Sequence, residues 1–332
     1  MNREKKLLSL LTQFKELGIN QQIDYNKFYL YSIITHSTAI EGSTVTEIEN
    51  QLLFDEGISA KDRLMNLDLK AAYEQSIAFA KSHSDITVEM LKKLSSVVLK
   101  NTGTTYQTAL GEFSSANGDL HLLNVTAGTG GRSYMNYSKV LIKLSELCKN
   151  INQRRKALSK ANIIECYKLS FDAHFHLVTI HPWADGNGRM SRLLMNQLQF
   201  EFRLIPTNIN KDRKAEYIEA LITTRENDDI ELFHNFMFDE HIRNLEQTIR
   251  NYQASIEDEG LEPRVDVGIN VGINEQRTLE LIRINNRITA KEVAESLSVS
   301  LRQGERIMAT LKEKGLIKRV GSNKSGHWEV VE

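Results

Sequence analysis

The chain has 332 residues, 41% of them hydrophobic, which is enough to build two globular domains. Its formal charge of −1 predicts no global attraction to nucleic acid or to an anionic membrane. No run approaches the roughly 20 apolar residues of a membrane helix, and the two cysteines provide no disulfide framework, so we expect a cytoplasmic protein without a membrane partner. Scarce prolines and abundant Leu, Lys and Glu predict a mostly α fold.

The first hundred residues are predicted to be helical. Apolar side chains recur at helical spacing over residues 3–17, about 21–41, about 60–82 and 87–100. Gly42 stands where the second of these helices should end. Thr46 and Glu49 have the spacing of a capping box, which predicts a short helix ending near Gly57. We treat residues 1–100 as an N-terminal helical region.

The pattern changes between Asn101 and Asn136. Gly and Thr are frequent there and apolar residues are spaced loosely, which predicts a β-hairpin followed by a loop. The run GTGG, residues 128–131, lacks the flanking pattern of a phosphate loop and is expected to be a turn. Helical spacing then returns over 137–156, 159–180, 187–204, 212–225 and from Asp228 or Asp229 to about 257. His174 and His176 are two residues apart on one helix, so they cannot chelate one metal.

The stretch HPWADGNGRMSR joins a helix end, a glycine turn and the start of a new helix. Pro182 disfavours helical geometry at His181, so this imidazole should project from a bend. Its unperturbed pKa of about 6.5 suits a general base acting on a hydroxyl. Asp185 supplies the single carboxylate with which Mg²⁺ is usually held beside phosphate oxygens and water.

The second half of this stretch favours anion binding. Gly186, Asn187 and Gly188 allow the backbone to approach a ligand closely at a helix N-terminus, which attracts phosphate. Arg189 and Arg192 lie three residues apart on the new helix, so both guanidinium groups can reach a polyphosphate. Each position alone is an ordinary turn or surface residue, and only their occurrence together in this order indicates phosphoryl chemistry.

The C-terminal part is predicted to be a separate domain. Residues 258–274 contain two VGIN copies and no helical period, which is typical of a linker. Helices are then expected over 275–285, 290–297 and 301–314, followed by a hairpin of 317–320 and 327–331, an order that resembles a winged helix-turn-helix domain over 275–332. This domain has 11 Lys and Arg against 8 Asp and Glu. Its basic side chains predict a DNA or protein partner: Arg302, Arg306, Lys318, Arg319 and Lys324.

The stretch from His181 to Arg192 resembles the signature of the Fic (Fido) family: His, Pro, aromatic, any residue, Asp or Glu, Gly, Asn, Gly, Arg, two further residues and Arg. Trp183 fills the aromatic position. The resemblance implies a helical Fic-type core with a small β-hairpin flap over residues 101–257. It also implies a protein adenylyltransferase, in which His181 deprotonates a Ser, Thr or Tyr hydroxyl that attacks the α-phosphate of ATP.

By the same resemblance, Mg²⁺ is the cofactor and Asp185 its ligand. The residues implied to contact ATP are Gly186, Asn187, Gly188, Arg189, Met190, Ser191, Arg192 and Tyr217. Tyr217 would lie near the adenine. Ile218 and Arg225 depart from the residues of some relatives in this region, and so does Ser114, which follows Gly111 to Phe113 where an Arg is common. These departures leave the base pocket and the alignment of the flap open.

A second, shorter resemblance lies in the helix of residues 21–42. Ser37, Glu41 and Gly42 match the inhibitory motif that Fic proteins carry beside the core. The resemblance implies that the Glu41 carboxylate pairs with Arg192 and holds ATP in an unproductive pose, since Arg–carboxylate pairs are charge-assisted. In some family members the same Glu assists removal of AMP from the target.

Several alternatives remain open from the sequence. The chain is interpreted as an autoinhibited adenylyltransferase that modifies a target protein or itself. The competing hypothesis is a nucleotide-sensing transcription regulator that binds DNA through the winged helix. A third is a Fic enzyme that removes AMP or uses another donor, such as a donor of UMP, phosphate or phosphocholine. A homodimer is also among the assemblies considered.

Overall fold

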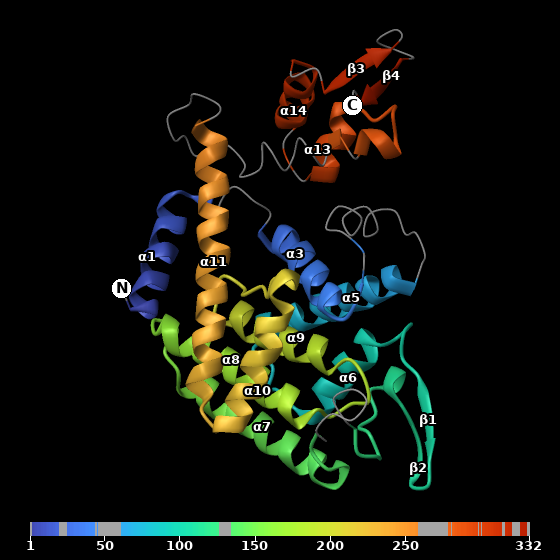
Figure 1. Cartoon of the computed structure of the whole chain (residues 1–332), viewed down its shortest axis with the longest axis vertical. Helices are drawn as coiled ribbons and strands as arrows, with labels where there is room; N and C mark the ends of the chain where they lie inside the picture. The colour runs from blue at the N-terminus through green and yellow to red at the C-terminus, as the bar shows by residue number, and fades with distance from the viewer. Residues whose placement is uncertain are drawn as a thin grey trace. The chain divides into compact units, whose positions relative to one another are not determined.

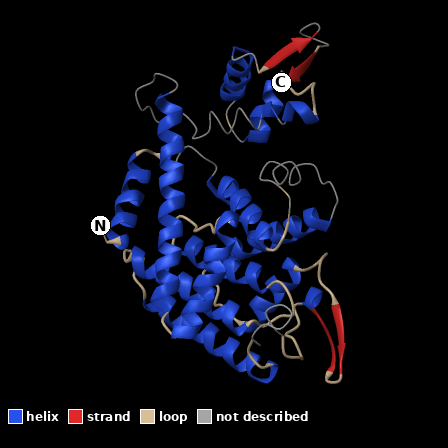
Figure 2. Ribbon diagram, in the orientation of Figure 1, coloured by secondary structure: helices blue, strands red, loops and turns tan. Residues whose placement is uncertain are grey.

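The computed structural model describes residues 2–19, 25–43, 45, 61–125, 134–257, 278–279, 281–297, 299, 301–313, 316–320 and 326–330. The mostly α prediction is confirmed, since within these ranges strands form only two short antiparallel pairs (Figure 2). The chain divides into two compact units. The first comprises Met1–Glu4 and Tyr29–His241, and the second comprises Lys5–Phe28 and Ile242–Glu332.

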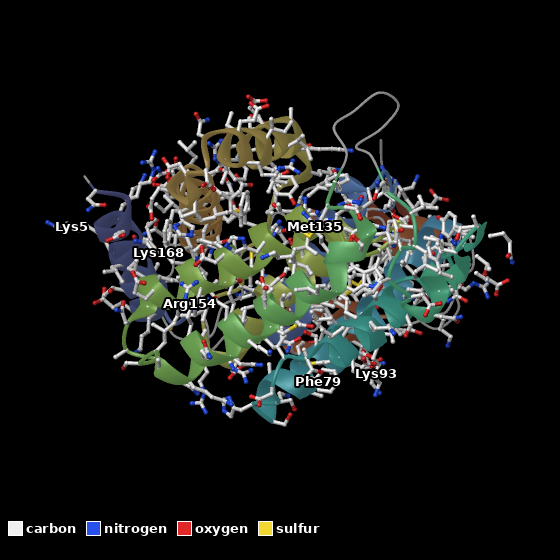
Figure 3. The ribbon with its side chains drawn as sticks, turned by 90° about the horizontal axis from the view of Figure 1, so that it is seen from below. Lys5, Phe79, Lys93, Met135, Arg154 and Lys168 are labelled. Atoms are coloured by element: carbon white, nitrogen blue, oxygen red, sulfur yellow. The ribbon has the colours of Figure 1, made fainter. Side chains whose placement is uncertain are left out.

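The first unit is a bundle of helices with α9 at its centre (Figure 1). In chain order its elements are α3 (Tyr25–Ile40), α5 (Lys61–Lys81), α6 (Val88–Val98), β1 (Thr105–Thr108), β2 (Gly111–Ser114), η1 (Ser115–Asn117), α7 (Tyr137–Ala157), α8 (Ile163–Ile180), α9 (Asn187–Glu201), η2 (Lys211–Arg213) and α10 (Lys214–Asn227). Helix α9 packs against α8 and α5, while α6 packs on α5 and α7 packs on α8. Figure 3 shows α5 and α6 side by side, with Phe79 and Lys93 marking them.

The core of this unit is built from the apolar faces that the helical spacing predicts. Its largest fully buried side chains include Trp183, Tyr73, Tyr167, Tyr217 and Phe171. Both cysteines are buried free thiols, as the sequence predicts. Almost every side chain of α9 is buried, including polar ones such as Asn196 and Gln199. A helix that is enclosed on all sides is held rigidly, so the residues at its N-terminus have a fixed position.

Local capping explains where the helices begin. The Thr87 hydroxyl accepts a hydrogen bond from Met90 N at 3.1 Å and starts α6. Asn162 accepts one from Glu165 N at 3.3 Å, so α8 begins at Ile163 and not at Ser159. Asn210 caps the η2 turn that precedes α10, so that helix begins two residues later than expected.

Two helix ends also differ from the sequence prediction. Helix α9 stops at Glu201, before the expected Leu204, because Arg203 adopts a left-handed conformation with φ of 58°. Leu204 N then donates to Gln199 O at 2.8 Å, which closes the last turn. Asp228 is likewise left-handed and ends α10, so Asp229 alone caps the next helix, α11 (Ile230–Glu257).

The predicted hairpin is present between α6 and α7. Strands β1 and β2 pair antiparallel, with Tyr106 opposite Phe113, and their rings stack with centroids 4.9 Å apart. Phe113 is buried, whereas the turn residue Leu110 is exposed. The hairpin is therefore buried at the C-terminal end of β2 and presents its tip to solvent.

The second unit contains most of α1 (Arg3–Glu16), the C-terminal half of α11, and the C-terminal elements. These are α13 (Ala290–Leu297), α14 (Leu301–Glu313), β3 (Ile317–Val320) and β4 (His327–Val330). The predicted capping box is present, since Glu292 N donates to Thr289 Oγ1 at 3.2 Å and Thr289 N donates to Glu292 Oε2 at 2.7 Å. Helix α14 crosses α13 closely at Gly304, where a Cβ atom would lie 2.6 Å from Ala290 O.

Several predicted segments lie outside the described residues. They are the capping-box helix of 46–57, the GTGG turn of 128–131 and the linker of 258–274. In the first helix of the predicted winged domain, residues 278–279 and 281–284 are described and are helical. Among the helices described, none combines the length and the apolar character that crossing a membrane requires.

Candidate functional site

The junction between α8 and α9 holds His181 in a strained conformation. His181 N donates to Leu177 O at 3.0 Å as the last bond of α8, and the residue then adopts φ 54° and ψ 60°. This left-handed region costs a residue with a side chain roughly 1–2 kcal/mol. Pro182 follows and supplies no N–H, so the helix cannot continue. The predicted bend at His181 is therefore confirmed, and such strain is typical of functional positions.

The turn after His181 is braced by its own side chains. Trp183 is fully buried, and its indole Nε1 donates to Gly118 O at 3.1 Å. Asn187 accepts from Trp183 N at 3.1 Å and donates to Trp183 O at 2.7 Å. The Asn187 side chain is thus held in place within the turn. Its backbone N–H lies at the N-terminus of α9, where the first N–H groups of a helix have no partner within the helix.

The His181 imidazole is neutral and oriented. Its Nδ1 lies 3.4 Å from the carbonyl oxygen of Val178, which can only accept, so Nδ1 carries the proton and Nε2 carries the lone pair. Burial lowers the pKa of His181 to about 4. At neutral pH the imidazole can therefore accept a proton at Nε2, as a general base must.

Two arginines lie buried at the start of α9. Arg192 donates from Nε to Ser37 Oγ at 2.7 Å, and from Nη2 to Ser37 O at 3.0 Å and to Glu41 Oε1 at 2.6 Å. The Arg189 side chain is only 2% exposed, and its nearest carboxylate oxygen, on Asp185, is 3.5 Å from Nη2. Its Nε and Nη1 have no hydrogen-bond partner among the described residues. A buried guanidinium with unmet donors is a strong site for an anion.

The carboxylate of Glu41 lies at the N-terminus of α9. A Cβ atom at Gly188 would be 2.4 Å from Glu41 Oε1, so only glycine permits this approach. Burial acts to raise the pKa of Glu41, but the charges of Arg192, Arg189 and Lys214 outweigh it and lower the pKa. Glu41 is therefore ionised at neutral pH. The contact with Arg192 that the sequence predicts is present.

A cavity of about 770 Å³ is lined by His181, Glu41 and Arg192 together. It is lined by the end of α3, the C-terminal turn of α8, Gly188 and Arg192 of α9, one face of α10, and Tyr134 and Met135, which precede α7 (Figure 3 labels Met135). Its volume lies in the range of small-molecule and cofactor sites. Tyr217 lines it with the ring almost fully buried, and its hydroxyl lies 2.8 Å from His174 Nε2.

Five of the expected ATP contacts do not line this cavity: Gly186, Asn187, Arg189, Met190 and Ser191. Met190 is fully buried in the core, and its N–H already donates to Gly186 O at 2.9 Å. The Ser191 hydroxyl donates to Asn187 O at 2.8 Å inside the helix. Both side chains point into the packing of α9, because a helical segment exposes only one face to the cavity. The side chains of Met190 and Ser191 thus belong to the packing of α9, and the prediction that they contact ATP is corrected.

Sequence reasoning missed Tyr134 and Lys214, which line the cavity, and named Arg225 only as a departure from some relatives. Tyr134 stacks on the His181 imidazole with ring centroids 3.6 Å apart and planes 9° apart. Arg225 lies over the same Tyr134 ring, with its guanidinium carbon 5.8 Å from the centroid. Lys214 begins α10 and faces Glu41. Each belongs to a different segment from the glycine turn, so no local spacing in the sequence could have grouped them.

Asp185 is the residue that fits a magnesium ion. Its side chain is 54% exposed at the turn, with Oδ1 accepting from Gly186 N at 2.6 Å. The described residues contain no cluster of three or more His, Cys, Asp or Glu side chains that could enclose a metal ion. One exposed carboxylate beside an anion site matches the way Mg²⁺ binds together with phosphate oxygens and water.

Comparisons with known proteins agree with this geometry. Residues 85–199 match the Fic/DOC family. The chain is 27% identical over 202 residues to protein adenylyltransferase Fic of Drosophila mojavensis, a match that covers 59% of this chain and 36% of that protein. It is 22% identical over 208 residues to protein adenylyltransferase fic-1 of Caenorhabditis elegans, covering 58% of this chain and 36% of that protein. The chain thus spans little more than a third of these relatives.

Solved structures show the same fold. A Fic domain containing signaling protein from Bacteroides thetaiotaomicron superposes with a TM-score of 0.60 at 19% identity, covering 78% of this chain and 98% of that one. A Fic family protein from Desulfovibrio desulfuricans G20 gives 0.56 at 14% identity, covering 99% and 95%. The helical core, the hairpin and these matches lead to one conclusion: the chain carries a domain of the Fic/DOC family over residues 85–199.

Proposed function

We propose that the chain is a protein adenylyltransferase that transfers AMP from ATP to a hydroxyl side chain of a target protein. The observation that carries this proposal is a neutral, oriented base and a buried cation that line one cavity, His181 and Arg192, with a second buried cation, Arg189, in the same first turn of α9. The names of the curated relatives support the same reaction class.

The start of α9 would hold the phosphates. Arg189 offers two unmet N–H donors, and the first turn of α9 offers backbone N–H groups from Asn187 and Gly188. Gly188 leaves space at the backbone that any larger residue would fill. Arg192 would grip the β- and γ-phosphates. Fixed donors of this kind stabilise charge that develops during phosphoryl transfer without reorganising.

His181 would then act on the acceptor. Its Nε2 takes the proton of the target hydroxyl while that oxygen forms a bond to the α-phosphorus of ATP. The bond between the α-phosphorus and the bridging oxygen to the β-phosphate breaks, and pyrophosphate leaves with the electron pair. Mg²⁺, held by Asp185 and phosphate oxygens, would supply neutralisation of the phosphate charge. The products are a phosphodiester-linked AMP and pyrophosphate.

We further propose that Glu41 restrains this reaction. Its carboxylate already occupies Arg192 Nη2 at 2.6 Å and lies against Gly188, where a phosphate group would need to sit. Two anions cannot share one guanidinium edge without repulsion, so ATP would bind with its terminal phosphates displaced. The hydrogen bonds from Arg192 to Ser37 hold α3 in register for this contact.

The remaining regions fit this function as separate modules. We propose the hairpin of β1 and β2 as the flap, along which an extended target segment would add as a strand. We propose residues 275–332 as a winged helix-turn-helix module that contacts DNA or a protein, on the basis of the order α13, α14 and hairpin. The linker and the domain boundaries given above belong to the same proposal.

Mass spectrometry tests the function directly. Lysate proteins are incubated with ATP, Mg²⁺ and the Glu41→Gly variant, and peptides are searched for an added AMP group on Ser, Thr or Tyr. We expect such peptides, and we expect them to be absent with the double variant Glu41→Gly, His181→Ala. Peptides carrying phosphate or UMP in place of AMP would overturn the choice of donor.

A further inference from the structure

Tyr134 has no role in the reaction described so far, yet it makes the closest ring contact of the proposed base. Its ring lies parallel to the His181 imidazole at 3.6 Å between centroids and at an angle of 9°. This is a tight stack over nearly the full face of the imidazole. The ring therefore excludes water from that face and limits rotation of the imidazole about its side-chain bonds.

Two further contacts hold Tyr134 in place. Tyr134 N donates to Val125 O at 2.9 Å, which fixes the backbone where the chain leaves the hairpin region. The Arg225 guanidinium carbon lies 5.8 Å from the Tyr134 centroid, within the range of a cation–π contact. Arg225 is itself positioned, because its Nε donates to Leu221 O at 3.1 Å within α10. Three segments thus meet at the Tyr134 ring, which contacts both the His181 imidazole and the Arg225 guanidinium.

We propose that Tyr134 is a positioning residue for His181, which sets the orientation of the imidazole and keeps it dry so that Nε2 faces the acceptor hydroxyl. This inference rests on the proposed function of His181 as base. The hydrogen bond from Nδ1 to Val178 O is long, at 3.4 Å, and is too weak to fix the ring alone. The stack with Tyr134 adds a second restraint, and the two together fix the plane of the imidazole ring.

The charged and titratable groups around His181 shift its pKa in opposite directions. His121, whose N donates to Pro182 O at 3.1 Å, and Arg225 both oppose protonation of His181, whereas Glu41 favours it. The largest contribution to the lowered pKa of His181 is burial. Tyr134 is the aromatic ring that covers the imidazole. Removing the ring should therefore expose the imidazole and raise its pKa toward the ordinary 6.5.

The first experiment is a histidine NMR titration of the full chain without ATP or metal, with His181 assigned by its loss in His181→Ala. We expect Tyr134→Ala to raise the pKa of His181 by at least about two units and Tyr134→Phe, which keeps the ring, to leave it unchanged. Tyr137→Ala, three residues along the same segment and outside the cavity lining, is the matched control and should also leave it unchanged. An unchanged pKa in Tyr134→Ala would overturn the proposal.

The second experiment separates this role from simple loss of structure. In the Glu41→Gly background, the ratio of AMP transfer at about pH 5.5 to that at about pH 8 should fall at least about threefold in Tyr134→Ala relative to Tyr134→Phe, because only the exposed imidazole is protonated at the lower pH. Equal ratios would contradict the proposal. If no variant transfers AMP while the pKa of His181 still rises, the proposed function fails and the positioning role stands.

Discussion

Two regions of the chain collect cationic side chains, and they differ in burial. At the start of α9, the side chains of Arg189 and Arg192 are 2% and 4% exposed, and Arg192 lines the cavity. On the C-terminal hairpin, Lys318 is 61% exposed and pairs with Glu329 at 2.9 Å, while Arg319 lies over the Trp328 ring at 4.8 Å. The cationic side chains of both regions predict contact with phosphate groups, of ATP in the first region and of DNA in the second.

The difference shows what burial adds to charge. A buried cation pays a desolvation penalty of several kcal/mol, so it is retained where an anion or a fixed set of acceptors compensates. Exposed ion pairs contribute about 0–1 kcal/mol and impose little geometry. The Nε and Nη1 donors of Arg189 have no hydrogen-bond partner among the described residues in spite of this penalty. The hairpin cations are already engaged by neighbours on their own sheet.

The largest effect should come from the base beside the buried cations. We expect His181→Ala to reduce AMP transfer by about 10²- to 10⁴-fold, because no other group near the acceptor takes its proton. His176→Ala, an exposed residue on the same helix, is the control and should retain the native rate. The measurement is AMP transfer in the Glu41→Gly background. Comparable losses in both variants would mean that α8 is merely destabilised.

The second effect is a gain. Glu41→Gly frees Arg192 for ATP, and one charge-assisted hydrogen bond contributes about 1.5–3 kcal/mol, so transfer should rise roughly tenfold to hundredfold. Glu16→Gly, which also removes an exposed glutamate at a helix end, should change nothing. Rates are compared at saturating ATP. An unaltered rate in Glu41→Gly would remove the restraining role from this residue and leave the Arg192 contact purely structural.

Gly188→Ala tests whether phosphates bind at the start of α9. The new methyl group displaces the Glu41 carboxylate, which lies 2.4 Å from its position, but it also fills the space that a phosphate needs. We expect ATP affinity about tenfold weaker, both alone and combined with Glu41→Gly, measured by calorimetry. If the double variant binds ATP as tightly as Glu41→Gly, the phosphates do not approach the backbone at this position.

The smallest effect is expected at the exposed cations. Lys318→Ala removes a surface pair with Glu329, so AMP transfer should stay within about twofold of the parent chain. A tenfold change would break the contrast between the two regions and would bring the C-terminal hairpin into the reaction. Circular dichroism on the same samples shows whether the variant has kept its fold.

The features that could be predicted from the sequence are those that residues close together along the chain determine. Helical periodicity and caps located most of the helices, including the capping box of Thr289 and Glu292. The run from His181 to Arg192 carries its bend, its glycine turn and its cations within twelve consecutive residues. A motif that is contiguous in sequence forms its site through local backbone geometry, so it can be recognised without any knowledge of tertiary packing.

The parts that escaped prediction depend on packing between distant segments. Nothing in the sequence near Tyr134 indicates that its ring covers His181, since the contact requires the hairpin region and α8 to meet. Met190 and Ser191 sit inside the motif yet point into the core, which only the orientation of α9 decides. The early end of α9 follows from a left-handed Arg203, a conformation that no propensity predicts for arginine.

Isotope labelling tests the central claim most directly. The Glu41→Gly variant is incubated with lysate, Mg²⁺ and ATP that carries the label on either the α- or the γ-phosphate. We expect the lysate to gain protein-bound α-label over the same lysate given Glu41→Gly, His181→Ala, and to gain no γ-label over that control, which accounts for the kinases of the lysate. A gain of γ-label over the control, or equal α-label in both samples, would contradict the proposed reaction.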